Sequence, residues 1–248
     1  MKKIYFAVAA MAMLMIAGCE KQNGTIDNAS GIDEFNISLK GFTGASGAKT
    51  YWDDYGLWWD SVGTDMIIIN GKVFEIKKEN GTWKAKGLNG GVDAEEGNYY
   101  VAYPYSPTSA NYNSNTHLYG PITFVDDENP PEKDVIPMAA VSNTNNLTLI
   151  PCCAVIKGAY SVEFYSDREG QEAGTCSGEI YTIAYIDMSN AKLVEGTADH
   201  NTLTDGDGDG YIIIPLAGES VTAFLNVDGN MTSHAVTLQK GHVYVIGN

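Results

Sequence analysis

Short apolar runs alternate with turn-forming dipeptides along most of the chain. Asn-Gly or Asp-Gly pairs end β-prone segments at 70–71, 80–81 and 228–229. Because Asn, Asp and Gly tolerate the positive φ angles of tight hairpin turns, these pairs predict antiparallel connections. No long run has apolar residues at helical spacing. The pattern predicts an all-β protein of sandwich type, with strands at 65–70, 73–77, 99–103, 211–216, 223–227 and 243–246.

Three neighbouring stretches differ in pattern. Residues 66–69 are apolar throughout, which predicts a central strand buried on both faces. Residues 72–77 alternate polar and apolar side chains, which predicts an edge or half-exposed strand. Ser, Asn, Asp and Pro dominate residues 106–131, where only 118–125 is strand-like. We therefore expect a long surface excursion there.

The N-terminus has the organisation of an export signal. Lys2 and Lys3 precede an apolar run over 4–17, and small residues lead to Cys19. This run is too short for a comfortable transmembrane span. The string LMIAGC at 14–19 resembles a bacterial lipobox, in which the cysteine receives a diacylglyceryl group and the chain is cut before it. The alternative is an ordinary secretory signal with an incidental cysteine.

Composition and charge exclude several function classes. The chain has 31 acidic against 15 basic residues and a net charge of −16, which argues against nucleic-acid binding. Its four histidines are scattered, and no nucleophile elbow, zinc-binding helix or phosphate-binding glycine loop occurs. We expect a protein that is not an enzyme and needs no cofactor. If the protein were an enzyme, a carboxylate-based glycosidase would be the best hypothesis, although no spacing of carboxylates identifies the catalytic acid and base.

A dense aromatic and acidic patch is the first candidate binding site. Trp52, Trp58 and Trp59 stand among tyrosines and aspartates within 51–60. Such a patch suits glycan contact, because rings stack on sugars while carboxylates accept hydroxyl hydrogen bonds. The alternative, which we favour, is that these tryptophans fill a core or an inter-domain seam.

An aspartate-glycine repeat is a weak calcium candidate. Asp205, Asp207 and Asp209 copy the opening of an EF-hand loop, but Leu216 at its twelfth position supplies no side-chain oxygen. An acidic hairpin loop is the simpler interpretation, and we expect no metal site.

Three cysteines follow Cys19. Adjacent side chains on a strand point to opposite faces, so at most one of Cys152 and Cys153 is directed toward Cys176. A disulfide is one alternative, and buried thiols are the other.

Several motifs together resemble the fimbrillin-like proteins of Bacteroidales, which are subunits of major and minor fimbriae (type V pilins). They are YWDDYGLWWDSVGTDMIIIN at 51–70, GNYYVAYPYSP at 97–107, DVIPMAA at 134–140, LTLIPCCAVIKGAYSVEF at 147–164 and TLQKGHVYVIGN at 237–248. The resemblance implies two consecutive transthyretin-like β-sandwich domains, at 33–144 and 145–248. A signal peptide at 1–18 and a linker at 19–32 precede them.

The resemblance also implies an assembly mechanism at the cell surface. In that family an outer-membrane lipoprotein loses its first strand to a protease, and the open groove accepts a strand of a neighbouring subunit. Here the removable strand would lie at 35–42, and the donor would be the C-terminal region. The implied partners are other pilin subunits, the outer membrane through the lipid on Cys19, and host or bacterial glycans or proteins.

The candidate cleavage positions depart from the family. Polymerising members are commonly cut after an arginine, yet the only arginine here is Arg168, far downstream. Lys40 and Lys49 are the basic residues available after the first strand. An uncut tip or anchor subunit, or a stand-alone lipid-anchored glycan-binding surface protein, would need no cut.

The N-terminus of the exported chain tests the lipobox hypothesis. We expect mass spectrometry of the membrane-extracted protein to find a terminal peptide that begins at Cys19 and carries acyl chains. An unacylated terminus at another residue before Lys40 would contradict the hypothesis.

Overall fold

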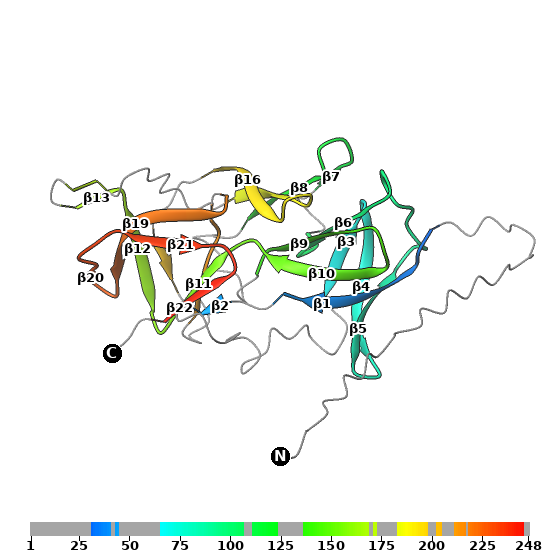
Figure 1. The fold of residues 1–248 in the computed structure, drawn as a ribbon, viewed down its shortest axis with the longest axis horizontal. Helices are drawn as coiled ribbons and strands as arrows, with labels where there is room; N and C mark the ends of the chain where they lie inside the picture. The colour runs from blue at the N-terminus through cyan, green and yellow to red at the C-terminus, as the bar shows by residue number, and fades with distance from the viewer. Residues whose placement is uncertain are drawn as a thin grey trace, which may run out of the picture.

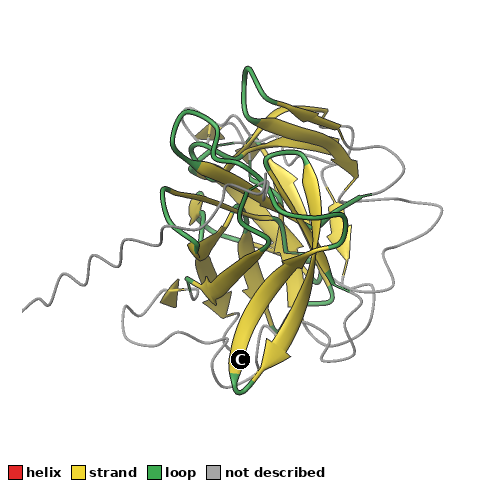
Figure 2. Cartoon of the chain, turned by 90° about the vertical axis from the view of Figure 1, so that its right-hand side faces the viewer, coloured by secondary structure: helices red, strands yellow, loops and turns green. Residues whose placement is uncertain are grey.

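The computed structural model describes residues 31–40, 43–44, 65–106, 111–123, 136–168, 171–172, 183–197, 202–204, 211–216 and 218–245. Within these ranges every regular element is a β-strand, as Figure 2 shows. The predicted all-β class is therefore confirmed. Most strands of the first half of the chain lie at one end of the molecule, and most strands of the second half lie at the other (Figure 1).

The first sheet closes into a barrel of seven strands. The β1–β10 pair is parallel, and every other pair in the barrel is antiparallel. Closure leaves no open edge, which distinguishes this sheet from the predicted sandwich layer. In spatial order the strands are β1 (Glu34–Leu39), β10 (Asn146–Pro151), β9 (Met138–Ser142), β6 (Tyr99–Tyr103), β3 (Met66–Ile69), β4 (Lys72–Glu79) and β5 (Thr82–Gly87).

The predicted hairpins are present where the dipeptides placed them. Asn70 and Asn80 have φ angles of 42° and 49°, and each is followed by a glycine with positive φ. They connect β3 to β4 and β4 to β5. β3 is buried as predicted, and β4 is half-exposed but paired on both sides, so it is not an edge strand.

Alternation sorts the barrel side chains between two cores. Ile67 and Ile69 point into the barrel with Phe35 and Phe74, whereas Ile68 joins a second cluster outside it. This two-sided burial explains why residues 66–69 are all apolar.

The C-terminal strands form two further sheets. Most of their buried side chains share one cluster, to which Ile156, Phe164 and Leu225 belong. The first sheet has the order β18 (Tyr211–Ile214), β11 (Ala154–Lys157), β22 (His242–Val245) and β2 (Thr43–Gly44). The second contains β17 (Thr202–Thr204), β12 (Ser161–Tyr165), β19 (Ser220–Val227), β20 (Asn230–Met231) and β21 (Val236–Gln239). β13 (Asp167–Arg168) and β14 (Gln171–Glu172) pair separately.

A fourth sheet joins the two halves of the sequence. β7 (Asn111–Asn113) and β8 (Leu118–Thr123) continue into β15 (Ile183–Asp187) and β16 (Lys192–Thr197). Tyr119 and Ile122 of β8 are buried. Part of the predicted surface excursion at 106–131 is therefore a packed hairpin, because these apolar side chains cover the second cluster.

The barrel also extends past the predicted domain boundary at 144/145. β10 pairs with β1 and β9, so the barrel continues to Pro151. Cys152 and Cys153 then lead the chain out of it. Cys152 lies in the cluster outside the barrel and Cys153 in the barrel cluster, as expected for adjacent residues with opposite directions.

The barrel core sets the stability of this half of the molecule. Phe74 is fully buried, with its ring centroid 5.5 Å from that of Phe35. We expect Phe74→Ala to lower the free energy of unfolding by about 3–5 kcal/mol, because it removes a large buried ring. Urea denaturation measures this, with Leu88→Ala, at a 47% exposed position, as a control that changes stability by less than about 0.5 kcal/mol. Equal effects of the two substitutions would contradict this packing.

Candidate strand-exchange site

β1 is the strand that closes the barrel, and its backbone is paired on both sides. On one side it runs antiparallel to β5, with Phe35 opposite Ala85. On the other it runs parallel to β10, with Ile37 opposite Leu147. Figure 1 shows this strand in place in the barrel. Removing it would leave the facing edges of its two neighbours unpaired, with a groove between them.

Backbone hydrogen bonds fix where β1 begins and ends. The Asn36 amide donates to the carbonyl of Asn145 at 2.8 Å, and the Lys40 amide donates to the carbonyl of Leu149 at 2.8 Å. Before the strand, Ile32 and Val92 exchange two such bonds of 2.8 Å. Among the described residues of this segment, Lys40 is the last one bound to β10.

A glycine allows the chain to approach the barrel closely just before β1. Gly31 has a φ of +69°, and a Cβ there would lie 2.3 Å from the backbone carbon of Val92. A side chain would clash at this point and strain the backbone, so glycine is required.

The inward side chains of β1 complete the barrel core. Phe35 is fully buried, and its ring makes edge contacts with Phe74 and, at 4.9 Å between centroids, with Tyr99. Ile37 is 5% exposed, and Leu39 packs against the same cluster. Burial of Phe35 and Ile37 holds β1 in place by about 1.5–3 kcal/mol for each side chain.

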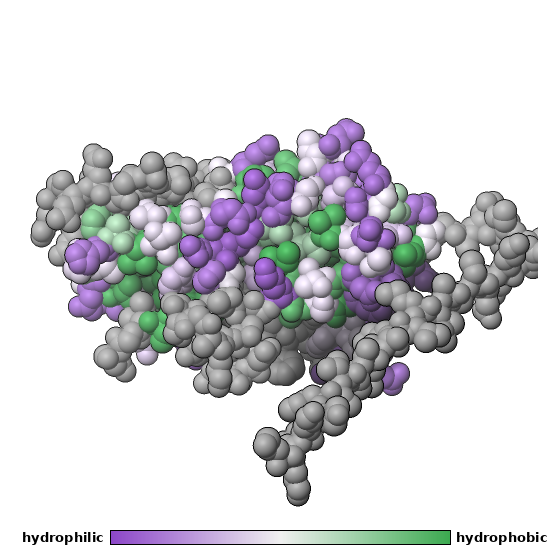
Figure 3. All heavy atoms as spheres, viewed as in Figure 1, coloured by the Kyte–Doolittle hydropathy of each residue, from purple (hydrophilic) through white to green (hydrophobic). Residues whose placement is uncertain are grey.

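The outward side chains of β1 bind to both neighbouring strands. The side-chain nitrogen Nδ2 of Asn36 donates to Oδ1 of Asn146 at 2.9 Å. The hydroxyl oxygen of Ser38 lies 2.9 Å from the hydroxyl oxygen of Thr148. These contacts fix the register of β1 against β10 by polar complementarity, in addition to the apolar alternation. The surface around this barrel end carries hydrophilic and hydrophobic residues side by side (Figure 3).

A cluster of charges attaches the start of β1 to β5. Glu34 forms an ion pair with Lys84 and lies 3.5 Å from the ammonium of Lys86. Lys86 also binds Glu79 at 2.6 Å. The hydrogen bond from Lys84 and the nearby positive charges hold the pKa of Glu34 below its ordinary value. Glu34 is therefore ionised, and its charge favours the closed barrel.

Of the two predicted processing positions, Lys40 and Lys49, the structure describes only Lys40. Lys40 is exposed and stands directly after β1. Lys49 lies outside the described residues. Between them, Thr43 and Gly44 form β2, which pairs in parallel with β22.

The C-terminal region, predicted as the donor, lies in a sheet between β11 and β2. Val243 is buried, and Val245 is 51% exposed. Their i, i+2 spacing is the same as that of Phe35 and Ile37.

Other predicted site residues fall outside the described part of the chain. Among the residues that are described, no group of three or more His, Cys, Asp or Glu side chains could hold a metal ion, and no helix could span a membrane. The predictions left without a structural description are Cys19, Lys49, Trp52, Trp58, Trp59, Cys176, Asp205, Asp207 and Asp209.

The buried cysteines next to β10 are structural. Cys152 and Cys153 are both fully buried. Burial raises the pKa of the Cys152 thiol to about 12, so this thiol is neutral and packs as a small apolar group.

Sequence reasoning missed two parts of this site. It did not identify β10 as the parallel neighbour of β1, because that pairing joins residues far apart in the sequence. It also missed the lysines of β5. The alternation of TWKAKG at 82–87, with Ala85 between Lys84 and Lys86, was the available signal.

No protein-family profile matches the chain. No curated protein matches it. Among solved structures it is similar to a proposed cell adhesion protein of Bacteroides ovatus, with 10% identity, 87% of this chain and 91% of that chain covered, and a TM-score of 0.43. A proposed cell adhesion protein of Bacteroides thetaiotaomicron gives 13% identity, 87% and 91% coverage and a TM-score of 0.39. A fimbrial protein of Bacteroides ovatus gives 12% identity, 88% and 48% coverage and a TM-score of 0.36. All three TM-scores lie below 0.5, so these similarities carry no argument about function.

The charge on Glu34 makes the stability of β1 in the barrel depend on pH. A lowered pKa stabilises the folded form above the ordinary value of 4.5, and this stabilisation disappears as the pH falls through the lowered pKa. We expect hydrogen-exchange protection of β1 to fall in that acidic range by more than the protection of β3 falls. Glu34→Gln should remove this excess, whereas Glu75→Gln, which breaks an ion pair with Lys77 on β4, should leave it. An unchanged excess in the Glu34→Gln chain would contradict the assignment.

Proposed function

We propose that the protein is a structural and adhesive subunit of a cell-surface fimbria. In this proposal it is exported as a lipoprotein, and subunits join when a strand of one replaces β1 of the next. The observation that supports it is the position of β1, a single six-residue strand that closes the barrel. The chain leaves β1 at an exposed lysine, Lys40.

Strand replacement is physically favourable at this position. An incoming strand with the direction of β1 would bind the edges of β5 and β10 together, and so would recover two rows of backbone hydrogen bonds. Two inward apolar residues at i, i+2 spacing would fill the space that Phe35 and Ile37 occupy. Without such a strand the groove would expose apolar side chains to water.

The C-terminal region is the donor in this proposal. Val243 and Val245 have the spacing that the groove needs. To donate this strand, a subunit must separate β22 from β11, and the parallel contact of β22 with β2 must also break. The new hydrogen bonds in the neighbour's barrel replace those lost in the donor's sheet.

Assembly in cells tests the proposal. We expect the unboiled outer-membrane protein to run as a heat-sensitive ladder whose subunits begin after Lys40 or Lys49. The double variant Lys40→Gln, Lys49→Gln should run as a monomer, because the first strand stays attached. Lys157→Gln serves as a control and should keep the ladder. A wild-type monomer that still begins at acylated Cys19 would rule out a polymerising stalk subunit.

Exchange can also be measured with purified protein. A specific protease site inserted directly after Lys40 would produce a cut chain that still holds β1. A labelled peptide of residues 33–40 should then replace β1 on heating and cooling. A peptide with Phe35→Ala and Ile37→Ala should bind more than about a hundredfold more weakly, because it loses two buried side chains. An Asp33→Ala peptide, changed at an exposed position before β1, is the control and should bind nearly as well. Equal binding of all three peptides would contradict side-chain recognition in the groove.

A further inference from the structure

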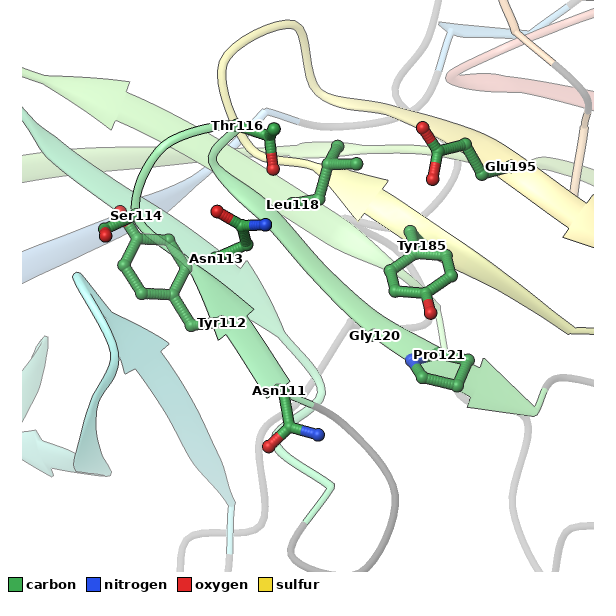
Figure 4. A pocket seen from close by; sticks show the side chains of 10 residues that line it. All are labelled: Asn111, Tyr112, Asn113, Ser114, Thr116, Leu118, Gly120, Pro121, Tyr185 and Glu195. Atoms are coloured by element: carbon green, nitrogen blue, oxygen red, sulfur yellow. The ribbon is translucent and has the colours of Figure 1, made fainter.

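A hollow on the outer face of the sheet β16-β15-β8-β7 has the size of a small-molecule site. It is open to solvent and has a volume of about 590 Å³, within the range of about 300–1,000 Å³ that small-molecule sites have. All four strands contribute to it, as Figure 4 shows. Its main lining residues are Asn111, Asn113, Leu118, Pro121, Tyr185 and Glu195. The other face of this sheet packs on the cluster that contains Tyr119 and Ile186.

The pairing of β15 with β8 is interrupted at Tyr185. Ala184 pairs with Ile122 and Ile186 pairs with Tyr119, so two residues of β8 stand opposite Tyr185. These two residues are Gly120 and Pro121. A Cβ at Gly120 would lie 3.0 Å from Cδ1 of Tyr185, so the glycine lets the tyrosine ring lie close against β8.

The pairing of β15 with β16 is interrupted at the same level. Ile183 pairs with Thr197 and Tyr185 with Val194, so Glu195 and Gly196 of β16 stand together opposite Ala184. Glu195 has a φ of 51°, a conformation that is uncommon for a residue other than glycine. Bulges redirect side chains and are frequent beside functional sites, and backbone strain is concentrated there as well.

The two bulges arrange an apolar surface with a polar rim. Tyr185, Leu118 and Pro121 are half-buried and form the apolar part. Glu195 and Asn113 are exposed at the rim, and the Glu195 carboxylate is directed across the sheet (Figure 4). An aromatic face beside amide donors and a carboxylate acceptor complements a sugar ring, which has an apolar C–H face and a border of hydroxyl groups.

We propose that this hollow binds a neutral saccharide. Among the described residues that line it, Glu195 alone is charged, and the whole chain has a net charge of −16. Anionic sugars would be repelled by both. The site goes beyond the fimbrial proposal, because none of its four strands pairs with β1. Saccharide binding and strand exchange can therefore succeed or fail separately.

Saturation-transfer NMR on the full mature chain tests the proposal. The probes are neutral oligosaccharides built from glucose, galactose, mannose or N-acetylglucosamine, with sialyllactose as the anionic probe. We expect transfer to at least one neutral probe and weaker transfer to sialyllactose. Tyr185→Ala should weaken binding at least about tenfold, since the stacking face is lost, whereas Tyr185→Phe should keep most of it.

Two further variants keep the test independent of folding. Asn113→Ala changes an exposed rim residue on the β7–β8 hairpin, and it should weaken binding severalfold. Oδ1 of Asn113 also accepts a hydrogen bond of 2.9 Å from the Asn115 amide in the hairpin turn, so binding is compared only for a chain whose circular dichroism matches the wild type. Tyr160→Ala removes a tyrosine that is 74% exposed away from the hollow, and it should leave binding unchanged. The proposal is wrong if no neutral probe receives saturation, if sialyllactose binds best, or if folded Tyr185→Ala and Asn113→Ala chains bind like the wild type.

Discussion

Pairing of β1 with both β5 and β10 is the constraint on which the barrel depends. A closed sheet has no free edge. The six residues of β1 close this sheet, and without them the barrel would have two open edges. The same segment supplies Phe35, whose ring meets Phe74 and Tyr99 at the centre of the core. One strand therefore both hydrogen-bonds the backbone edges of β5 and β10 and fills the core, so losing this strand removes both contributions together.

The two halves of the sequence share a core cluster and a sheet. The barrel cluster includes Val155 and Val243, which belong to the C-terminal sheets. The sheet that contains β8 and β15 takes strands from both halves. A change in the barrel is therefore transmitted to the C-terminal strands through packed side chains and through a shared sheet.

Local features of the fold were predictable, and long-range pairings were not. The turns at Asn70 and Asn80 follow from backbone preferences of the dipeptides, and burial of residues 66–69 follows from their uniform apolar character. The closed barrel depends on the parallel pairing of Asn36 with Asn146, which no local pattern encodes. The alternation of apolar and polar residues determines which face of a strand is buried, but it does not determine which strands pair with each other.

The hollow near Tyr185 was missed for a related reason. Its bulges interrupt the alternation of side chains, so the pattern around Gly120-Pro121 and Glu195-Gly196 does not indicate which face of the sheet each residue occupies. Only the assembled sheet brings Asn113, Tyr185 and Glu195 to one surface. The tryptophans that the sequence suggested for glycan contact all lie outside the described ranges, and no sequence pattern distinguishes Tyr185 from the other tyrosines.

The arrangement of β1 between two strands also has a mechanical consequence. A force that pulls along a strand in this position acts parallel to both neighbours, so it loads the hydrogen bonds on both sides in shear and all at the same time. A strand peeled from a single edge instead gives up its bonds one after another. A joint built at the β1 position would therefore resist traction along the strand axis far better than it resists sideways bending.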